Sequence, residues 1–295
     1  MFLTTGLTAA IEMVLKQAGA FAGPVLVTGI AASGFSECYQ VITGGRPYFL
    51  KVNDARKYPH MFDLEALGLR QLKAASVVRV PEVIGSGMHD GMQFLLLEWV
   101  EGGRSTAAVQ RDLGRRLARL HRVSSPSFGL DFDNFIGTLI QRNEPKTGWT
   151  DFFMANRLQP LVDMAESNGL IDCRICGKFD RLYDKLDGLY PQEPAALLHG
   201  DLWSGNFMVA APDEPVLIDP AVYFGHRETD LAMTTLFGGF DAAFYGAYQD
   251  EYPLEPGWQD RMQLWNLYPL LVHLNLFGAG YRPDIVRTLD LFAGR

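Results

Sequence analysis

The stretch from Leu197 to Met208, LLHGDLWSGNFM, holds the side chains of this chain that are best suited to chemistry. Apolar residues lead into a turn that carries His199, Asp201 and Asn206, and an apolar run follows. The pattern predicts a strand, a polar loop and a second strand, and loops on such scaffolds are where reactive side chains tend to lie. Further along, VLIDP places Asp219 at the end of another short apolar run.

These residue types match the parts of a phosphoryl-transfer site. One carboxylate can accept or orient the proton of a reacting hydroxyl, while an amide oxygen and a second carboxylate can hold magnesium. We therefore expect Asp201 to be catalytic, and Asn206 and Asp219 to be metal ligands. A turn that merely shapes a hairpin would explain either motif alone. The two motifs together favour the catalytic interpretation.

Longer segments around these motifs carry a family resemblance. HGDLWSGN, IDPAVYFGHRETDLAM and LFGGF closely resemble the fructosamine kinases, which are relatives of protein kinases and of aminoglycoside and choline phosphotransferases. FGLDFDNFIGT, WTDFFMANRLQP and PGWQDRMQLWNLYPLLVHLNLFG extend the resemblance over nearly the whole chain, most weakly at the N-terminus. It implies an α+β, bilobal, protein-kinase-like fold. We expect a five-stranded antiparallel nucleotide-binding lobe over residues 1–100 and a mostly helical catalytic and substrate-binding lobe over residues 101–295.

The resemblance also implies a reaction. A fructosamine kinase uses ATP and Mg²⁺ to phosphorylate the sugar 3-hydroxyl of a ketosamine, free or protein-bound, and the product then decomposes and frees the amine. A phosphotransferase for another small alcohol, such as an aminoglycoside or choline, is the enzymatic alternative, and a non-catalytic nucleotide-binding module is another. The sequence does not distinguish fructose-, ribulose- and erythrulose-derived substrates.

The predicted first lobe starts with an amphipathic helix over residues 4–19 and three short strands that end near Lys51. A helix that starts near Pro59 would carry Glu65 within an otherwise apolar stripe. A buried carboxylate needs a cation, and Lys51 is the natural partner. The pair resembles the kinase lysine and glutamate that hold the ATP phosphates. A lysine extending to the surface is the alternative for Lys51.

Other segments of this lobe are expected to contact the nucleotide. The small residues of the turn from Gly29 to Gly34 would let backbone amides approach phosphates, although an ordinary hairpin is the alternative. Two more strands surround a His-Asp-Gly turn, and the run Phe94–Leu97 is expected to be buried on both faces. Glu98, Trp99 and Val100 then occupy the place of the kinase hinge, whose backbone groups meet adenine.

Three further residues receive roles in the second lobe. His199 is expected to brace the loop rather than titrate, and Asp230 to accept hydrogen bonds from the loop amides. Trp203 is expected to form a wall against the substrate, where its ring could attract a cation, with simple packing as the alternative. Helices are predicted over residues 105–123, in two segments between Trp149 and Tyr190, and over most of the chain after the catalytic region.

Composition limits the remaining possibilities. A formal net charge of −8 argues against a nucleic-acid surface, which needs clustered Lys and Arg. No apolar run has the length of a membrane span, and the first residues lack a basic leader, so a cytoplasmic protein without membrane contact is expected, with a monomer favoured. Cys173 and Cys176 form a lone CxxC, and Cys38 is remote in sequence. A structural zinc site would need four ligands.

Overall fold

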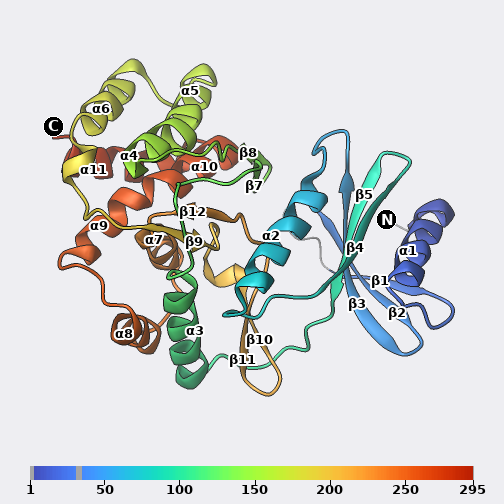
Figure 1. Ribbon diagram of the computed structural model, residues 1–295. Helices are drawn as coiled ribbons and strands as arrows, with labels where there is room; N and C mark the ends of the chain where they lie inside the picture. The colour runs from blue at the N-terminus through green and yellow to red at the C-terminus, as the bar shows by residue number, and fades with distance from the viewer. Residues whose placement is uncertain (1–2, 31–34, 295) are drawn as a thin grey trace. The chain divides into compact units, whose positions relative to one another are not determined.

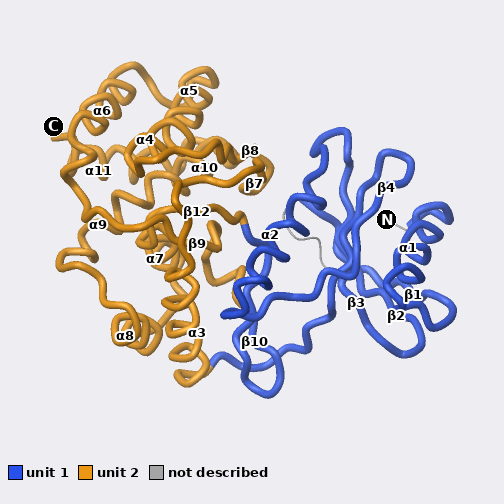
Figure 2. Tube along the Cα trace, in the orientation of Figure 1, with its two compact units in different colours: residues 1–105, 208–220 blue, residues 106–207, 221–295 orange. Residues whose placement is uncertain are grey.

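The structure, a computed structural model, describes residues 3–30 and 35–294. Its internal contacts divide the chain into two compact units (Figure 2). The first unit contains Met1–Ser105 and Met208–Pro220, and the second contains Thr106–Phe207 and Ala221–Arg295. The sequence assigned residues 208–220 to the second lobe, whereas the structure groups them with the first.

The first unit is built on a five-stranded antiparallel sheet with the strand order β1-β2-β3-β5-β4 (Figure 1). Two tight turns connect neighbouring strands, and both contain residues with positive φ: Gly44 and Gly45 in one, Asp90 and Gly91 in the other. Such turns match the twist of hairpin strands. The five strands predicted from the sequence are confirmed; they are β1 (Leu26–Gly29), β2 (Glu37–Thr43), β3 (Arg46–Asp54), β4 (Val83–His89) and β5 (Met92–Glu98).

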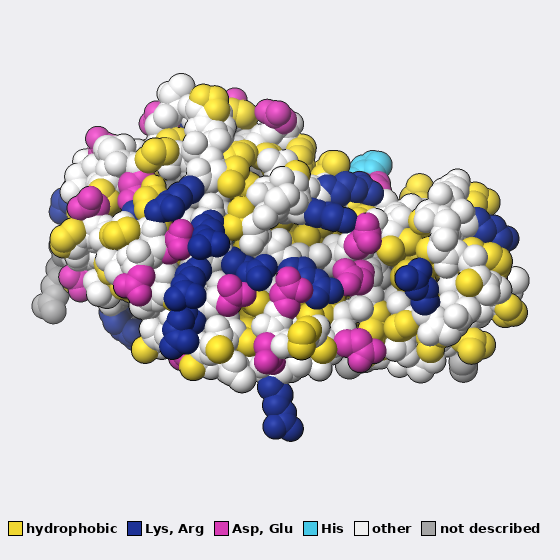
Figure 3. Space-filling view, turned by 60° about the horizontal axis from the view of Figure 1, so that its bottom comes forward, with side chains coloured by type: hydrophobic (Ala, Val, Ile, Leu, Met, Phe, Trp, Pro, Cys, Tyr) yellow, Lys and Arg dark blue, Asp and Glu magenta, His cyan; other side chains and the backbone are white. Residues whose placement is uncertain are grey.

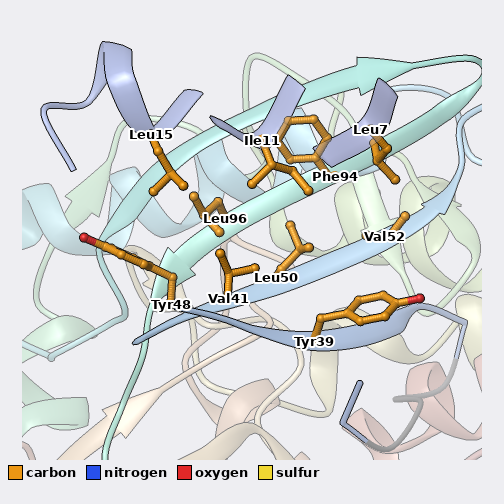
Figure 4. Close-up of a cluster of buried hydrophobic side chains, with 10 residues drawn as sticks. All are labelled: Leu7, Ile11, Leu15, Tyr39, Val41, Tyr48, Leu50, Val52, Phe94 and Leu96. Atoms are coloured by element: carbon orange, nitrogen blue, oxygen red, sulfur yellow. The ribbon is translucent and has the colours of Figure 1, made fainter. Parts of the chain in front are cut away.

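Helix α1 (Thr5–Gln17) closes the core of this sheet. Its side chains Leu7, Ile11 and Leu15, spaced four residues apart, pack on side chains of the central strands (Figure 4). Helix α2 (Met61–Ala75) packs against β4 and β5. All four residues from Phe94 to Leu97 are buried, as the unbroken apolar run predicted.

A short hairpin of β10 (Phe207–Ala210) and β11 (Glu214–Leu217) belongs largely to the first unit. Isolated bridges connect it there, from Ala210 to Gly102 and from Val216 to Arg79. This pairing fixes the segment that leads to Asp219.

The second unit is mostly helical, as predicted. Its small sheet has the order β12-β9-β6, formed by β12 (Tyr223–Gly225), β9 (Ala195–Leu198) and β6 (Ser124–Ser125). A further hairpin is formed by β7 (Asn134–Ile136) and β8 (Leu139–Gln141). Strands of two or three residues are too short to show an alternating pattern.

Helices make up most of this unit. The α-helices are α3 (Ala107–Leu120), α4 (Trp149–Phe152), α5 (Gln159–Ser167), α6 (Cys173–Tyr183), α7 (Glu228–Leu236), α8 (Ala242–Glu251), α9 (Trp258–Trp265), α10 (Leu267–Phe277) and α11 (Arg282–Phe292). A π-helical turn, Phe153–Leu158, joins α4 to α5, and 3₁₀ turns occupy Leu186–Gly188, Ser204–Asn206 and Ala279–Tyr281.

Aromatic side chains form much of the core of the second unit. Trp149 stacks on Phe153 at a centroid distance of 5.1 Å, and Trp265 stacks on the buried His226 at 5.1 Å. Trp265 and Tyr268 are buried, and Trp258 is half-buried.

Charged side chains of both signs share the surface (Figure 3). The exposed Arg119 of α3 and Arg122, which follows that helix, both reach Glu251 of α8, and Arg116 of α3 pairs with Asp112. Within residues 3–30 and 35–294, no helix is both long and apolar enough to cross a bilayer.

Candidate active site

Lys51 lies at the centre of an ion-pair triad in the first unit. From β3, its Nζ atom reaches Glu65 Oε1 at 2.8 Å and Asp219 Oδ1 at 2.7 Å. The side chains of Lys51 and Glu65 are only 8% and 13% exposed, whereas that of Asp219 is 32% exposed. The predicted pairing of Lys51 with Glu65 is confirmed, and the pairing of Lys51 with Asp219 was not foreseen.

The triad keeps Lys51 charged. Burial by itself would lower the pKa of Lys51, but the carboxylates of Asp219 and Glu65 outweigh it, so the pKa lies above its usual value. A fixed positive charge therefore sits within β3, next to a carboxylate that still faces solvent.

Helix α2 presents Glu65 because of its apolar spacing. Phe62, Ala66, Leu69 and Leu72 are buried, which turns this face of the helix inward. Glu65 lies at the border of that face, where it meets Lys51. The stripe of apolar residues that predicted the helix also fixes the direction of the carboxylate.

A cavity of about 170 Å³ lies in the first unit beside the triad. Its walls include Glu98, Trp99 and Val100, the predicted hinge residues, together with Met208 and Ile218 from the hairpin segment, and it ends at Asp219. The remaining lining is Ile30, Phe49, Pro81 and Leu97. The predicted phosphate turn includes Gly29 and Ile30, but its residues 31–34 lie outside the described part of the chain.

The side chain of Glu98 has a structural function. Its carboxylate accepts a hydrogen bond from Arg79 Nη2 at 2.6 Å and another from the backbone amide of Glu82 at 3.1 Å. Arg79 also binds Glu214 of the hairpin at 2.8 Å. Sequence reasoning missed Arg79, because nothing in its local pattern shows that it connects β5 to a hairpin far along the chain. The backbone amide of Glu98 is also engaged, since it donates to the carbonyl oxygen of Glu82 at 2.8 Å.

In the second unit, Asp230 holds the loop that follows β9. Its two carboxylate oxygens accept hydrogen bonds from the backbone amides of His199, at 2.7 Å, and Gly200, at 2.9 Å. The prediction that Asp230 binds loop amides is confirmed. Asp230 is 2% exposed, and although burial would raise its pKa, hydrogen bonding from His121 and the loop lowers it below the usual value. The carboxylate is therefore held in its charged form.

His121 is a second support that the sequence did not reveal. Its Nε2 atom lies 3.2 Å from Asp230, and its Nδ1 atom lies 2.8 Å from the hydroxyl of Tyr248. All three side chains are buried. His199 is also fully buried, and its Nδ1 atom accepts a hydrogen bond from the amide of Asp201 at 3.3 Å, in agreement with a bracing function.

Gly200 is required by close packing within the loop. Its φ is +82°, and a Cβ atom at this position would lie 1.9 Å from the carbonyl oxygen of Ala221. The approach is close because the amide of Ala221 donates to the carbonyl of His199 at 2.9 Å. Only glycine combines this backbone conformation with this contact.

Asp201 and Asn206 face each other across the turn. The Nδ2 atom of Asn206 donates to Asp201 Oδ2 at 2.9 Å and to the Asp201 backbone oxygen at 2.8 Å. Because both donated bonds come from the nitrogen of the amide, its oxygen is directed elsewhere. The arrangement fixes the Asp201 carboxylate and presents an oxygen of Asn206 as a possible ligand atom.

The oxygen donors fit a hard divalent cation. Asp219 binds Lys51 through Oδ1, and its backbone has the unusual φ of +53°. Magnesium is commonly held by one or two carboxylates together with substrate phosphates, rather than by a complete protein cage. Consistently, no group of three or more His, Cys, Asp or Glu side chains suited to a metal occurs among the described residues.

Cys38 of β2 lies directly opposite Lys51 in the antiparallel ladder, whereas Cys173 and Cys176 lie on α6 of the second unit. Cys38, Cys173 and Cys176 form no disulfide bond within the described residues. Burial, together with the nearby Glu166, raises the pKa of Cys176 to about 11, so its thiol is protonated at neutral pH.

Each unit thus gathers one set of the predicted residues. Lys51, Glu65 and Asp219 meet in the first unit, where the cavity beside them has Glu98, Trp99 and Val100 in its walls. In the second unit one loop carries His199, Asp201 and Asn206, which are linked by hydrogen bonds, and Asp230 of α7 holds this loop by its backbone amides. Trp203 lies on the same loop and is 38% exposed. The chain passes between the units after Phe207 and after Pro220.

Comparison with known proteins identifies the family. The family model described as fructosamine kinase matches residues 9–293. A probable ketoamine kinase of Enterococcus faecium is 39% identical over 268 residues, which cover 90% of this chain and 95% of that protein. The chloroplastic protein-ribulosamine 3-kinase of rice, Oryza sativa subsp. indica, is 36% identical over 90% of this chain and 78% of its own length.

A solved structure agrees with these relatives. A protein from Thermobifida fusca that is assigned as a fructosamine-3-kinase superposes with a TM-score of 0.85 at 36% identity, over 96% of this chain and 98% of that one. The fold and the family expected from HGDLWSGN and its neighbouring motifs are confirmed. The chain belongs to the fructosamine kinase family and is a kinase that acts on ketosamines.

Proposed function

We propose that this enzyme transfers the γ-phosphoryl group of ATP to the 3-hydroxyl group of the sugar in ketosamines. The phosphorylated adduct then decomposes and releases the amine, so the reaction reverses glycation. The bridge from Lys51 to both Glu65 and Asp219 is the observation that carries the proposal. In protein kinases a lysine paired with a helix glutamate contacts the ATP phosphates, and a separate aspartate holds Mg²⁺. Lys51, Glu65 and Asp219 match these three residue types.

The cavity beside the triad fits the nucleobase. Phe49, Leu97 and Ile218 supply apolar walls, and the backbone of residues 98–100 supplies polar groups at its edge. Apolar walls with a few convergent polar groups are typical of small-molecule sites. We assign the adenine ring to this cavity, and the phosphates to Lys51, with Glu65 fixing the ammonium group.

The loop of the second unit supplies the acceptor side of the reaction. Asp201 orients the sugar hydroxyl and receives its proton, while Asn206 holds the carboxylate in place through its Nδ2 atom. Asp230, His199 and His121 keep the loop rigid. In phosphoryl transfer, most of the rate gain comes from alignment and charge neutralisation, so a rigid carboxylate serves better than a strong base.

Asn206 and Asp219 are the residues that would hold Mg²⁺. When bound, the ion neutralises charge on the ATP phosphates. Release of Asp219 from Lys51, by competition with the ion and the phosphates, would free both oxygens of that carboxylate.

The test is ADP release measured with a panel of acceptors. We expect fructose-, ribulose- or erythrulose-derived amines to stimulate ATP turnover well above choline and aminoglycosides. An Asp201→Asn variant serves as a control for contaminating kinases and should lose the stimulation. A preference for choline or an aminoglycoside over every ketosamine would overturn the assignment.

A further inference from the structure

A row of aromatic rings in the second unit starts at the loop that carries Asp201. Trp203 meets Phe237 at a centroid distance of 5.9 Å, Phe237 meets His273 at 5.1 Å, and His273 meets both Phe277 at 5.5 Å and Tyr281 at 5.1 Å. We call these five residues the aromatic row. They come from four separate segments, so the tertiary structure alone assembles them.

The aromatic row is unusually open to solvent for so many large rings. Trp203 is 38% exposed, Phe237 is 44% exposed and Phe277 is 59% exposed. Rings that only filled the core would be buried, as Trp149 and Trp265 are. A patch of exposed aromatic surface marks a site that another molecule covers.

The histidine within the row is neutral. Its Nδ1 atom lies 2.7 Å from the carbonyl oxygen of Pro269, which can only accept, so Nδ1 carries the hydrogen. Burial lowers the pKa of His273 below its usual value, which also favours the uncharged ring. At neutral pH the His273 ring therefore adds no positive charge to the aromatic row.

Packing holds the first ring of the row beside the reacting loop. The amide of Trp203 donates to the carbonyl of Asp201 at 3.2 Å. The indole lies over Gly205, where a Cβ atom would come within 2.2 Å of the ring, and Ser204 packs on Gly239, where a Cβ atom would come within 2.4 Å of the Ser204 side chain. Glycines on both sides of the loop thus let Trp203 and the turn next to Phe237 approach each other.

We propose that the aromatic row is the subsite for the amine part of the ketosamine and gives the enzyme a preference for amines that carry an apolar or aromatic group. The inference rests on the proposed function, because it requires the sugar hydroxyl to lie at Asp201. The amine of a ketosamine is attached to C1, close to the C3 carbon that carries the reacting hydroxyl, and the row is the apolar surface continuous with the same loop. The secondary amine of a ketosamine is a cation when protonated, and aromatic faces attract cations.

The position of the aromatic row next to the Asp201 loop indicates that the row binds part of the substrate. A surface for a partner protein would need no connection to Asp201, whereas the first member of the row is two residues from it. Phe277 and Tyr281 lie at the far end, at the close of α10 and in the 3₁₀ turn that follows. The end next to Trp203 meets every ketosamine, and the end at Phe277 is reached only by amines with a large substituent.

The experiment compares two fructose adducts that differ only in the amine, one made from benzylamine and one from methylamine. We expect the wild-type enzyme to show a higher kcat/KM for the benzylamine adduct. Phe237→Ala and Phe277→Ala should each reduce that preference by about 3- to 10-fold, the effect of one aromatic pair contact. In Phe277→Ala the kcat/KM for the methylamine adduct should fall less than that for the benzylamine adduct, since a small amine makes less contact with that ring.

Matched variants separate recognition from folding. Leu291→Ala removes another exposed apolar side chain, 61% exposed on α11 of the same unit, and should leave the preference unchanged. Phe237→Tyr keeps the ring and should keep the preference. Melting temperatures of all variants should lie close to that of the wild type.

Two results would be negative in different ways. A preference that is identical in the wild type, Phe237→Ala and Phe277→Ala would overturn the subsite, while leaving ketosamine phosphorylation in place. Absence of ADP release with both adducts in the wild type, with choline or an aminoglycoside active, would overturn the proposed function and the subsite together.

Discussion

The Nζ atom of Lys51 lies 2.7 Å from Oδ1 of Asp219, although the two residues are 168 positions apart in the sequence. Their contact depends on the β10–β11 hairpin, which is bridged to Gly102 and Arg79 of the first unit. The side chain that we assign to the phosphates and one that we assign to the metal are thereby held in one compact unit.

Replacing Lys51 by Met should abolish most turnover and lower stability. The variant leaves Glu65, which is 13% exposed, without its cation, and breaking a buried pair costs about 3 kcal/mol or more. The measurement pairs ADP release on an active ketosamine with urea unfolding. The double variant Lys51→Met with Glu65→Leu is the matched control, and it should recover much of the stability but none of the activity. Wild-type turnover in Lys51→Met would show that the triad is only structural.

Asp201→Asn should separate chemistry from nucleotide binding. The change is nearly isosteric and removes a charge and a proton acceptor, while Asn206 and Asp219 remain. Positioned acid-base groups are typically worth ~10²- to 10⁴-fold in rate, so we expect turnover to fall at least about a hundredfold. Thermal stabilisation by ATP with magnesium should persist. Near-normal turnover would contradict the role of the loop.

Asp219→Ala should show the complementary behaviour. Loss of a proposed metal ligand weakens nucleotide binding, and a ligand stabilises the folded state in proportion to its affinity. The thermal shift caused by ATP and magnesium should therefore shrink in this variant and remain in Asp201→Asn. Equal shifts in the two variants would place the metal elsewhere.

Gly200→Ala should destabilise the second unit. The added Cβ atom would lie 1.9 Å from the Ala221 carbonyl oxygen, and the φ of +82° is unfavourable for alanine, so we expect a loss of at least about 1–3 kcal/mol. Gly246→Ala in α8 is the control, because nothing lies within 4 Å of its Cβ position. In a helix interior this exchange should stabilise by roughly 0.5–1 kcal/mol. Chemical denaturation of both variants gives the comparison, and equal stabilities would refute the packing argument.

Stability should fall as the pH drops below about 6.5. Burial lowers the pKa of His226, an effect that the nearby Glu228 and Glu193 only partly oppose, and burial also lowers the pKa of His273. When the pH falls below the pKa that these histidines have in the unfolded chain, the unfolded chain binds protons that the folded chain does not bind. This difference favours unfolding, and the loss of stability continues until the pH reaches the lower pKa of the folded state. Each histidine contributes at most about 1.4 kcal/mol per pH unit in this window.

The measurement is the melting temperature between pH 7.5 and 5. His226→Gln will itself change stability, because the ring stacks on Trp265, so its informative quantity is the slope against pH. That slope should be smaller than in the wild type. An unchanged slope would mean that His226 titrates normally in the folded protein.

The sequence alone determined the family and much of the local structure. Short apolar runs joined by glycine-containing turns predicted the five strands, and apolar side chains spaced by three or four residues predicted the helices of the first unit. The same helical spacing predicted the contact of Lys51 with Glu65, because Glu65 interrupts an otherwise apolar stripe and requires a cation. HGDLWSGN and its neighbouring motifs identified the family, and Asp230 was correctly expected to bind the loop amides.

Only the tertiary structure decided which distant segments meet. The placement of residues 208–220 with the first unit, the Arg79 bridge to Glu98 and Glu214, and the His121 contact with Asp230 all join residues far apart along the chain. Periodicity reports which face of an element is buried, but it does not report which other element covers that face. The aromatic row has the same origin, since Trp203, Phe237 and His273 have ordinary local patterns and become one surface only when the loop and helix ends pack together.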